Sequence, residues 1–379
     1  MRIGFVLAAF GLCCVRAQSV DTDGMLIVNG QRTFIVGLYN FAKGPDPWTD
    51  ARAAGFNLVR VKPAVAELRM ARKHGFYAWT TVGPNEAAIR KTVEALRDEP
   101  ALIFWETEDE PTFVWKKPME IRTSPELIIA ARKLVQSLDP KRLFYLNHSP
   151  THLVSTLRKY NGGAGIVAAD VYPVIPRGIR NQYALWPDGQ QGDLLNESIS
   201  QVGQYADKMR QVAGPAKPVF MVLQGFAWES IQKPPDPKMM LYPTVQQARF
   251  MAYQSIVHGA NGILYWGLHL GPENNPAWQA ARAVAAELKQ IAPELAARAL
   301  PEKFALEYFE TGHSLDRGVA YTLRPTRDGV LLIAVNEDKN PVDVSFGKLR
   351  YASCSVALRN GVLRDTFAPF EARVYRCLR

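Results

Sequence analysis

Eight short apolar runs alternate with segments of helical period, and this alternation constrains the fold more than any other feature. The apolar runs cover residues 34–38, 56–61, 76–81, 101–105, 142–146, 165–169, 218–223 and 262–265. The helical segments include residues 65–73, 86–97, 125–138, 201–212, 245–258 and 277–291. Apolar strands that alternate with helices are typical of a parallel sheet covered on both faces. Eight such units over about 260 residues predict an α/β fold, the (β/α)8 TIM barrel.

An open, doubly wound sheet is the alternative fold, and it would need a phosphate-binding turn. Residues 163–168 contain the glycine spacing of a dinucleotide fingerprint. They precede an apolar run instead of following one and opening a helix, so they fail the structural context of that motif. The chain also lacks a Walker loop, and its six histidines have no ligand spacing. We therefore expect no metal and no organic cofactor.

The pattern changes after Pro301. Short alternating runs cover residues 318–323, 329–335, 342–346, 353–358 and 372–375, and turn residues such as Asn360-Gly361 separate them. This pattern predicts a small antiparallel β domain. We divide the chain into a signal peptide at residues 1–17, a barrel at residues 18–300 and a β-sandwich at residues 301–379.

The first seventeen residues have the composition of a secretory signal. Arg2 is followed by an apolar run over residues 3–15, and Ala17 is a small residue suited to cleavage. The run is short for a membrane anchor, which is the alternative. We expect a secreted or periplasmic protein with no integral membrane segment after cleavage. Cys354 and Cys377 would then remain, either as one disulfide or as two buried thiols.

The basic excess of the chain does not indicate nucleic acid as a partner. Lys and Arg number 45 against 36 Asp and Glu, but the longest basic run is Lys116-Lys117. The charge is therefore dispersed over the surface instead of forming a phosphate-binding stripe. The sequence leaves the oligomeric state open.

Polar and aromatic side chains follow the predicted strands, at the end of a barrel where active sites are built. Carboxylates, amides and aromatic rings together suit a carbohydrate, because rings stack on sugars and polar groups bond hydroxyls. The predicted substrate-binding residues are Tyr39, Arg60, Glu108, Asp109, Asn147, His148, Tyr172, Gln224 and Trp266.

The acidic run after the fourth strand is the strongest local indication of chemistry. Residues 105–111 read Trp-Glu-Thr-Glu-Asp-Glu-Pro, with four carboxylates in five residues. Mutual repulsion beside an apolar strand should raise the pKa of at least one of them, as a proton donor at neutral pH requires. A solvated acidic turn is the simpler alternative.

Several segments resemble the clan A glycoside hydrolases, which are retaining glycosidases with a (β/α)8 barrel. Residues 24–39 and 54–60 are similar to the segments that form their first two strands. Asp109-Glu110-Pro111 is similar to the Asn-Glu-Pro motif that carries their acid/base, with Asp in place of Asn. Residues 170–173 and Trp266 resemble the ends of their sixth and eighth strands, and a closing β-sandwich is common in such chains. The resemblance covers roughly residues 24–379.

The resemblance implies that Glu110 is the general acid of a secreted hydrolase acting on a poly- or oligosaccharide. The chain departs from the family at the end of the seventh strand, where Gln224 occupies the position of the nucleophilic Glu. A neutral amide cannot form a glycosyl ester. The usual retaining mechanism is therefore not expected.

Three hypotheses follow from this departure. In the first, the enzyme inverts, and Asp170 or Glu229 activates water as the second catalytic carboxylate. In the second, a 2-acetamido group of the substrate attacks, because Glu106, Glu108 and Glu110 alternate and would share one side if the strand continued. In the third, the chain is a carbohydrate-binding protein that has lost catalysis.

Overall fold

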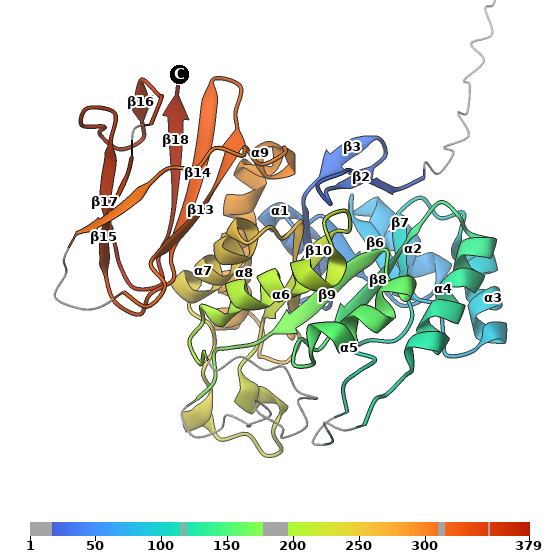
Figure 1. The fold of residues 1–379 in the computed structure, drawn as a ribbon. Helices are drawn as coiled ribbons and strands as arrows, with labels where there is room; N and C mark the ends of the chain where they lie inside the picture. Colours follow the sequence, from blue (N-terminus) through green and yellow to red (C-terminus); the bar gives the residue numbers. More distant parts are fainter. Residues whose placement is uncertain (1–16, 115–116, 118–119, 177–195, 310–314, 348) are drawn as a thin grey trace, which may run out of the picture.

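The computed structural model describes residues 17–379 except residues 115–116, 118–119, 177–195, 310–314 and 348. It consists of a barrel followed by a β-sandwich that lies beside helix α7 (Val245–Val257; Figure 1). Apart from Ala17, the predicted signal segment lies outside the described residues. Among the described residues, no helix is both long enough and apolar enough to cross a membrane.

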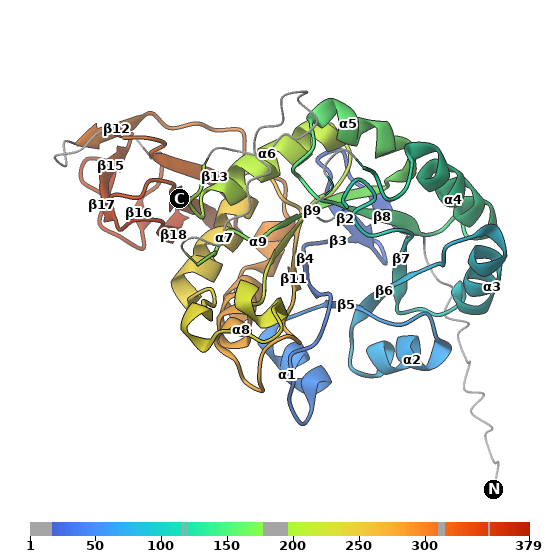
Figure 2. The same cartoon turned by 90° about the horizontal axis from the view of Figure 1, so that it is seen from below.

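Eight parallel strands close into a barrel, and the helices surround it (Figure 2). The order around the barrel is β4, β5, β6, β7, β8, β9, β10 and β11, with β11 paired to β4. The strands are β4 (Ile35–Leu38), β5 (Leu58–Arg60), β6 (Tyr77–Thr81), β7 (Leu102–Glu106), β8 (Leu143–His148), β9 (Ile166–Val171), β10 (Val219–Gln224) and β11 (Gly262–Trp266). The predicted TIM barrel is confirmed, and each strand overlaps one of the eight apolar runs.

The helices follow from local signals in the chain. Helix α7 begins with a capping box in which Thr244 and Gln247 bond each other's backbone. The helices are α1 (Pro47–Ala54), α2 (Val65–Lys73), α3 (Glu86–Leu96), α4 (Pro125–Leu138), α5 (Val154–Arg158), α6 (Gln201–Ala213), α7 (Val245–Val257), α8 (Pro276–Gln290) and α9 (Ala292–Ala296). The 3-10 helices are η1 (Lys159–Gly163), η2 (Trp228–Ile231) and η3 (Pro237–Met239). The six predicted helical segments form helices, whereas α1, α5 and α9 were not predicted.

Two apolar layers hold the barrel together. Alternate residues of each strand point to opposite faces, so that side chains such as Leu58, Trp79 and Val222 fill the interior. Their neighbours, such as Val59 and Leu223, pack against the helices. The filled interior leaves only the strand ends free to carry polar chemistry.

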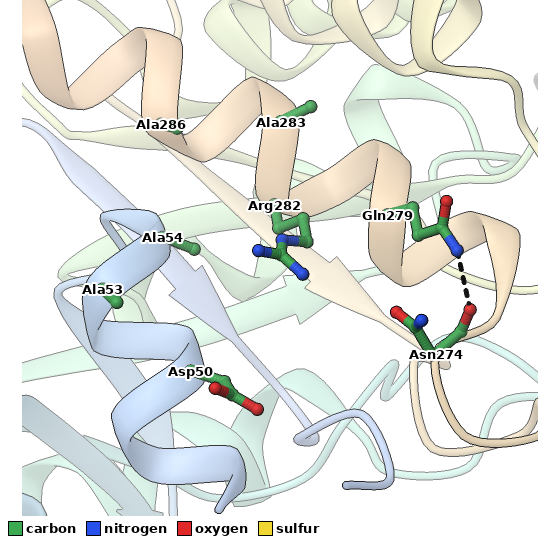
Figure 3. A pocket seen from close by; sticks show the side chains of 8 residues that line it. All are labelled: Asp50, Ala53, Ala54, Asn274, Gln279, Arg282, Ala283 and Ala286. Atoms are coloured by element: carbon green, nitrogen blue, oxygen red, sulfur yellow. Dashed lines mark hydrogen bonds between the residues drawn. The ribbon is translucent and has the colours of Figure 1, made fainter.

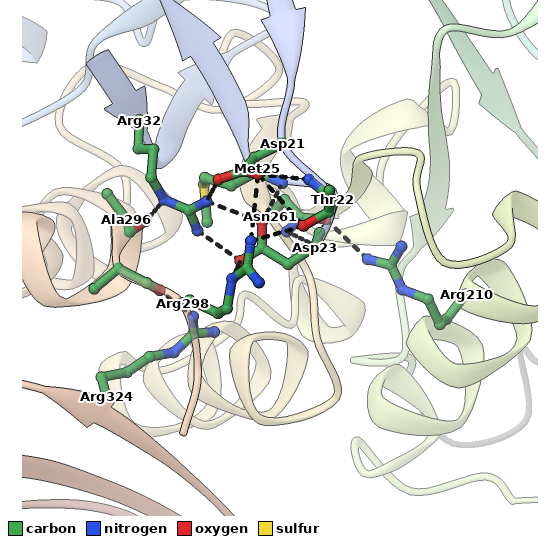
Figure 4. Close-up of polar contacts among 11 residues, drawn as sticks. Asp21, Thr22, Asp23, Met25, Arg32, Arg210, Asn261, Ala296, Arg298 and Arg324 are labelled. Atoms are coloured by element: carbon green, nitrogen blue, oxygen red, sulfur yellow. Dashed lines mark hydrogen bonds and ion pairs between the residues drawn. The ribbon is translucent and has the colours of Figure 1, made fainter. Parts of the chain in front are cut away.

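A small three-stranded antiparallel sheet covers the end of the barrel where the strands begin. Strands β1 (Ser19–Val20), β2 (Leu26–Val28) and β3 (Gln31–Thr33) form it. Its Arg32 bonds Asp23 at 2.6 Å, and it also bonds Asp21 and the carbonyl of Ala296 (Figure 4). Arg298, in the connection to the β-sandwich, lies 3.3 Å from Asp21. The contacts of Arg32 and Arg298 therefore join this small sheet to α9 and to the segment that follows it.

The C-terminal region contains two antiparallel sheets with an apolar core between them. One sheet contains β12 (Leu306–Phe309), β15 (Val342–Phe346) and β17 (Leu363–Phe367). The other contains β13 (Val319–Pro325), β14 (Gly329–Asn336), β18 (Ala372–Leu378) and β16 (Ser353–Cys354). Strands β12 and β17 were not predicted. A disulfide joins Cys354 to Cys377 across the β16–β18 pair.

A polar cluster around His258, which we call the histidine cluster, connects the barrel to the β-sandwich. The Nδ1 atom of His258, at the end of α7, lies 2.9 Å from Asp207 of α6. Its Nε2 atom lies 2.8 Å from Glu337, the residue after β14. Gln254 also donates a hydrogen bond to Glu337. The cluster therefore spans the junction of the two domains.

Candidate active site

Two groups of contacts hold polar side chains at the ends of the barrel strands. The first contains the ion pair between Arg60 of β5 and Glu106 of β7, with 2.8 Å between Nε and Oε2. The Arg60 guanidinium lies over the ring of Tyr39, 5.6 Å from its centroid. The Tyr39 hydroxyl lies 2.7 Å from the Tyr145 hydroxyl. The Arg60–Glu106 ion pair therefore lies next to aromatic side chains of the barrel interior.

Glu106 is fully buried, and its surroundings shift the pKa of its carboxyl group strongly. Burial raises the pKa of the Glu106 carboxyl to about 7, with Arg60 acting in the opposite direction and Asp109 adding to the rise. Its Oε2 atom is bonded to Arg60. The pairing makes Glu106 part of the framework of the site and keeps Arg60 in place.

In the second group of contacts, the side-chain amide of Asn147 bridges two carboxylates. The side-chain amide of Asn147, at the end of β8, donates to Asp109 at 2.9 Å and also to Asp170. The Tyr172 hydroxyl donates to the other oxygen of Asp170 at 2.7 Å. Three strand ends are thereby connected, and both oxygens of the Asp170 carboxyl accept a hydrogen bond.

Glu110 lies on a tight turn beside this network. Its φ is 47°, in the left-handed region that non-glycine residues seldom adopt. The turn is held by a hydrogen bond from the Glu110 N–H to the Asn147 carbonyl at 3.2 Å, and by one from Phe113 to the Glu110 carbonyl at 3.0 Å. Burial, followed by the charge of Asp109, raises the pKa of Glu110 to about 8. Glu110 therefore retains its proton at neutral pH.

Glu110 and Asp170 act as a pair of carboxyl groups. Burial and the charge of Glu110 raise the pKa of Asp170 well above its usual value. Two neighbouring carboxyl groups resist ionising together, so the pair retains a proton at neutral pH. The donors Asn147 and Tyr172 favour the ionised form of Asp170. Burial thus raises the pKa of both carboxyl groups, and the pair is suited to sharing one proton.

The side chains of Glu106, Glu108 and Glu110 do not share one side of a strand. Strand β7 ends at Glu106, and the backbone then turns. Glu108 is 40% exposed and pairs with Arg122 at 3.6 Å. The substrate-assisted hypothesis required the strand to continue to Glu110, and this condition is not met because β7 ends at Glu106.

Two other predicted site residues are held by backbone groups. Gln224 accepts a hydrogen bond from the Val174 N–H at 2.9 Å and donates to the carbonyls of Val174 and Phe226. Glu229, in η2, accepts from the Asp236 N–H at 2.6 Å. Both side chains are almost completely buried. Their contacts stabilise loops at the rim of the barrel.

His148 and Trp266 lie on opposite faces of their strands. His148 follows Asn147, so it points out of the barrel, and its ring contacts Tyr160 of η1 with 6.0 Å between centroids. Burial lowers the pKa of His148 to about 3. Trp266 points inward and stacks on Tyr172 with centroids 5.7 Å apart. His148 is therefore separated from the group that contains Asn147, Asp170 and Trp266.

An aromatic wall flanks the carboxyl pair. Tyr172 and Trp266 stack, and Phe226 contacts both, with centroid distances of 5.1 and 5.0 Å. The indole N–H of Trp228 donates to the Tyr172 carbonyl at 3.1 Å. The sequence did not indicate Phe226 as a site residue. Its position two residues after Gln224 was the one available signal.

A hollow of about 620 Å³ lies outside the barrel, between α1 and α8. Asp50 and Arg282 line it from the two helices, and Gln279 bonds the Asn274 carbonyl at its edge (Figure 3). None of its lining residues belongs to the carboxyl pair. In the described part of the chain, no group of three or more His, Cys, Asp or Glu side chains could hold a metal ion.

Comparison with known proteins supports the fold. No family model matches the sequence, and no relative was found among curated proteins. Among solved structures, a variant of the glycoside hydrolase family 5 mannosidase from Rhizomucor miehei is similar, with a TM-score of 0.52, 11% identity, and coverage of 74% of this chain and 100% of that one. The family 30 subfamily 8 xylanase Xyn30A from Clostridium acetobutylicum has a TM-score of 0.51, 11% identity, and coverage of 97% and 98%.

These similarities define the class of fold. Both proteins are glycoside hydrolases, and the xylanase matches the barrel and the C-terminal region together. At 11% identity the match establishes a glycoside hydrolase-like fold, with a β domain after the barrel. Activity and mechanism depend on the residues of this chain.

Proposed function

We propose that the protein is an O-glycosyl hydrolase of poly- or oligosaccharides in which Glu110 is the general acid. The observation that carries this proposal is the convergence of carboxyl groups on Asn147, whose side chain donates to Asp109 and Asp170 and whose carbonyl accepts the N–H of Glu110. Burial raises the pKa of Glu110 to about 8 and that of Asp170 well above its usual value. A protonated carboxyl group next to a carboxylate is the arrangement that cleaves a glycosidic bond. The aromatic wall of Tyr172, Phe226 and Trp266 offers a surface for a sugar ring.

Asp170 is the best candidate for the second catalytic group. Gln224 is neutral, and the carboxyl group of Glu229 binds the backbone of Asp236. Asp170 has both oxygens held by Asn147 and Tyr172, which fixes its orientation and suits a base that activates water. We therefore assign an inverting mechanism, in which Glu110 protonates the leaving oxygen and Asp170 takes a proton from the attacking water.

We further propose that the mature protein is exported after cleavage behind Ala17. The apolar leader and the Cys354–Cys377 disulfide support this, because disulfides persist in oxidising compartments. N-terminal sequencing of the protein recovered from the periplasm or medium tests it. A mature protein that begins elsewhere or stays in the cytoplasm would contradict it.

Product release from a panel of polysaccharides tests the hydrolase proposal. We expect Glu110→Gln and Asp170→Asn to lower kcat/KM at least about 100-fold, the usual contribution of a general acid or base. Glu86→Gln, which alters an exposed glutamate of α3, is the matched control and should retain activity. NMR of the first anomer released distinguishes inversion from retention. Activity that persists in Glu110→Gln would contradict the assignment of the acid.

A carbohydrate-binding protein is the second candidate, and one observation favours it. Gln224, the neutral residue at the end of β10 where the resemblance led us to expect a nucleophilic Glu, is engaged with the backbone of Val174 and Phe226. If the wild-type protein releases no product, calorimetry with the same panel becomes the deciding measurement. Binding that Trp266→Ala abolishes would then favour recognition without hydrolysis.

A further inference from the structure

The residues before α4 return to the turn that carries Glu110. The backbone N–H groups of Arg122 and Thr123 both donate to the Pro111 carbonyl, at 2.9 and 3.0 Å. The Arg122 side chain reaches further and donates to the Asp109 carbonyl at 2.6 Å. Its guanidinium also lies 3.6 Å from Glu108. This segment therefore contacts Glu108, Asp109 and Pro111, the residues on both sides of Glu110.

The turn requires such support. Glu110 has a φ of 47°, which is unfavourable for a side chain with a Cβ and persists only where the surroundings enforce it. On the barrel side, the Glu110 N–H bonds the Asn147 carbonyl. On the outer side, Arg122 holds the carbonyl of the preceding residue. The two contacts fix the peptide group before Glu110 from opposite directions.

We propose that Arg122 is the positioning residue of the catalytic acid, because its bonds to Asp109 and Glu108 hold the turn that presents Glu110 to the substrate. This inference rests on the proposed role of Glu110. Arg122 does not need to touch the substrate for this role. It acts through the backbone of Asp109 and through its charge.

The charge of Arg122 adds a second effect. Asp109 from the turn, Asp170 and Tyr172 from the end of β9, and Arg122 from the segment before α4 all interact electrostatically with Glu110. Burial and Asp109 raise the pKa of Glu110, whereas Arg122 lowers it. Loss of Arg122 should therefore raise the pKa of Glu110 further. Loss of the Glu108 charge, which partly neutralises Arg122, should lower it.

Three variants test the inference: Arg122→Gln, Arg122→Lys and Glu108→Gln. The pKa of Glu110 is measured directly by carboxyl 13C NMR, assigned with Glu110→Gln, and the pH profile of kcat/KM is measured beside it. Low ionic strength is needed because Arg122 is 42% exposed and salt would screen it.

Opposite shifts are expected from the two charge-removing variants. Arg122→Gln should move the Glu110 pKa and the alkaline limb up by about 0.5 pH unit, and Glu108→Gln should move both down. Arg122→Gln should also lower kcat about 10-fold through misplacement of the acid. Arg122→Lys should keep the pH profile and lose only part of kcat. The control Arg90→Gln, in an exposed pair on α3, should change neither.

The outcomes separate this inference from the proposed function. An unchanged Glu110 pKa and unchanged kcat in Arg122→Gln would overturn the positioning role, even in an active enzyme. If the wild-type protein releases no product, the hydrolase proposal fails and the catalytic role of Arg122 fails with it, whereas the NMR titration still decides whether Arg122 controls the pKa of Glu110. If Arg122→Gln does not fold, the charge-retaining Arg122→Lys and the Glu108→Gln variant decide through the same two measurements.

Discussion

Gln224 bonds both backbone groups of Val174, accepting from its N–H and donating to its carbonyl, each at 2.9 Å. Only a side chain that both donates and accepts can form this pair of bonds, and a carboxylate cannot. The amide thus ties the segment after β9 to the end of β10. This contact gives a physical reason for an amide at the end of β10.

Replacing Gln224 by Glu should therefore destabilise the protein and create no retaining activity. The new carboxylate would be buried, would lose its donor to the carbonyls of Val174 and Phe226, and would face them with a negative charge. We expect the free energy of unfolding in urea to fall by about 2–4 kcal/mol. Gln246→Glu, at an exposed position of α7, is the matched control. A stable Gln224→Glu variant that forms a covalent glycosyl intermediate would contradict the structural role.

The barrel was predictable because buried parallel strands are continuous apolar runs, which few other elements produce. Helix α1 was missed, since only Ala51 in its eight residues is buried and its periodicity is weak. Strand β17 was missed because Arg364, Asp365 and Thr366 are polar, and only its end residues Leu363 and Phe367 enter the core. Short elements at a surface carry too few buried side chains to reveal their period.

The site was predictable in position but less so in detail. The rule that active sites lie at strand ends placed Arg60, Asn147 and Asp170 in one region, and the structure pairs Arg60 with Glu106 and Asn147 with Asp170 there. That rule does not say whether a side chain points into the barrel or out of it. It therefore treated His148 like Asn147, although the two side chains lie on opposite faces of β8. Val174, which forms two hydrogen bonds with Gln224, lies fifty residues away in a loop, and no local pattern reports such a contact.

The pH dependence of hydrolysis should reflect the carboxyl pair. Glu110 must be protonated to act as an acid, so kcat/KM should fall as the pH rises through about 8, the pKa of Glu110. On the acid side, activity should appear only once the pair has lost its first proton, which burial delays to a higher pH than an ordinary aspartate requires. Initial rates from about pH 4 to about pH 10 measure both limbs. An alkaline limb that is unchanged in an active Asp109→Asn variant would contradict the assigned cause, since Asp109 raises the pKa of Glu110.

The Cys354–Cys377 disulfide should stabilise the β-sandwich. It closes a loop with a sequence separation of 23 residues, and such a loop is expected to contribute about 3 kcal/mol. Thermal unfolding of the oxidised protein should therefore show a higher Tm for the β-sandwich than unfolding in reductant. The double variant Cys354→Ser, Cys377→Ser should resemble the reduced protein and be insensitive to reductant. Equal Tm values for the wild type with and without reductant would contradict this contribution.

The histidine cluster at the domain junction should make stability depend on alkaline pH. Burial disfavours the charged ring of His258, but the bonds to Asp207 and Glu337 outweigh it and raise the pKa of His258 to about 9. A group whose pKa is higher in the folded than in the unfolded state binds its proton more tightly when folded. Its stabilising contribution is therefore complete below about pH 6.5, where the unfolded histidine is also protonated, and is lost as the pH rises through about 9.

We expect the free energy of unfolding to fall by up to about 3 kcal/mol between pH 6 and pH 10 because of this cluster, since each tenfold gain in proton affinity on folding corresponds to about 1.4 kcal/mol. The His258→Gln variant should lose most of that dependence, and Glu337→Gln should lose part of it because one of the two carboxylate partners remains. The control His74→Gln lies outside the cluster and should keep the wild-type slope. Urea unfolding at a series of pH values measures the slope for all four proteins. If wild type and His258→Gln share one slope, the cluster does not couple protonation to the junction of the domains.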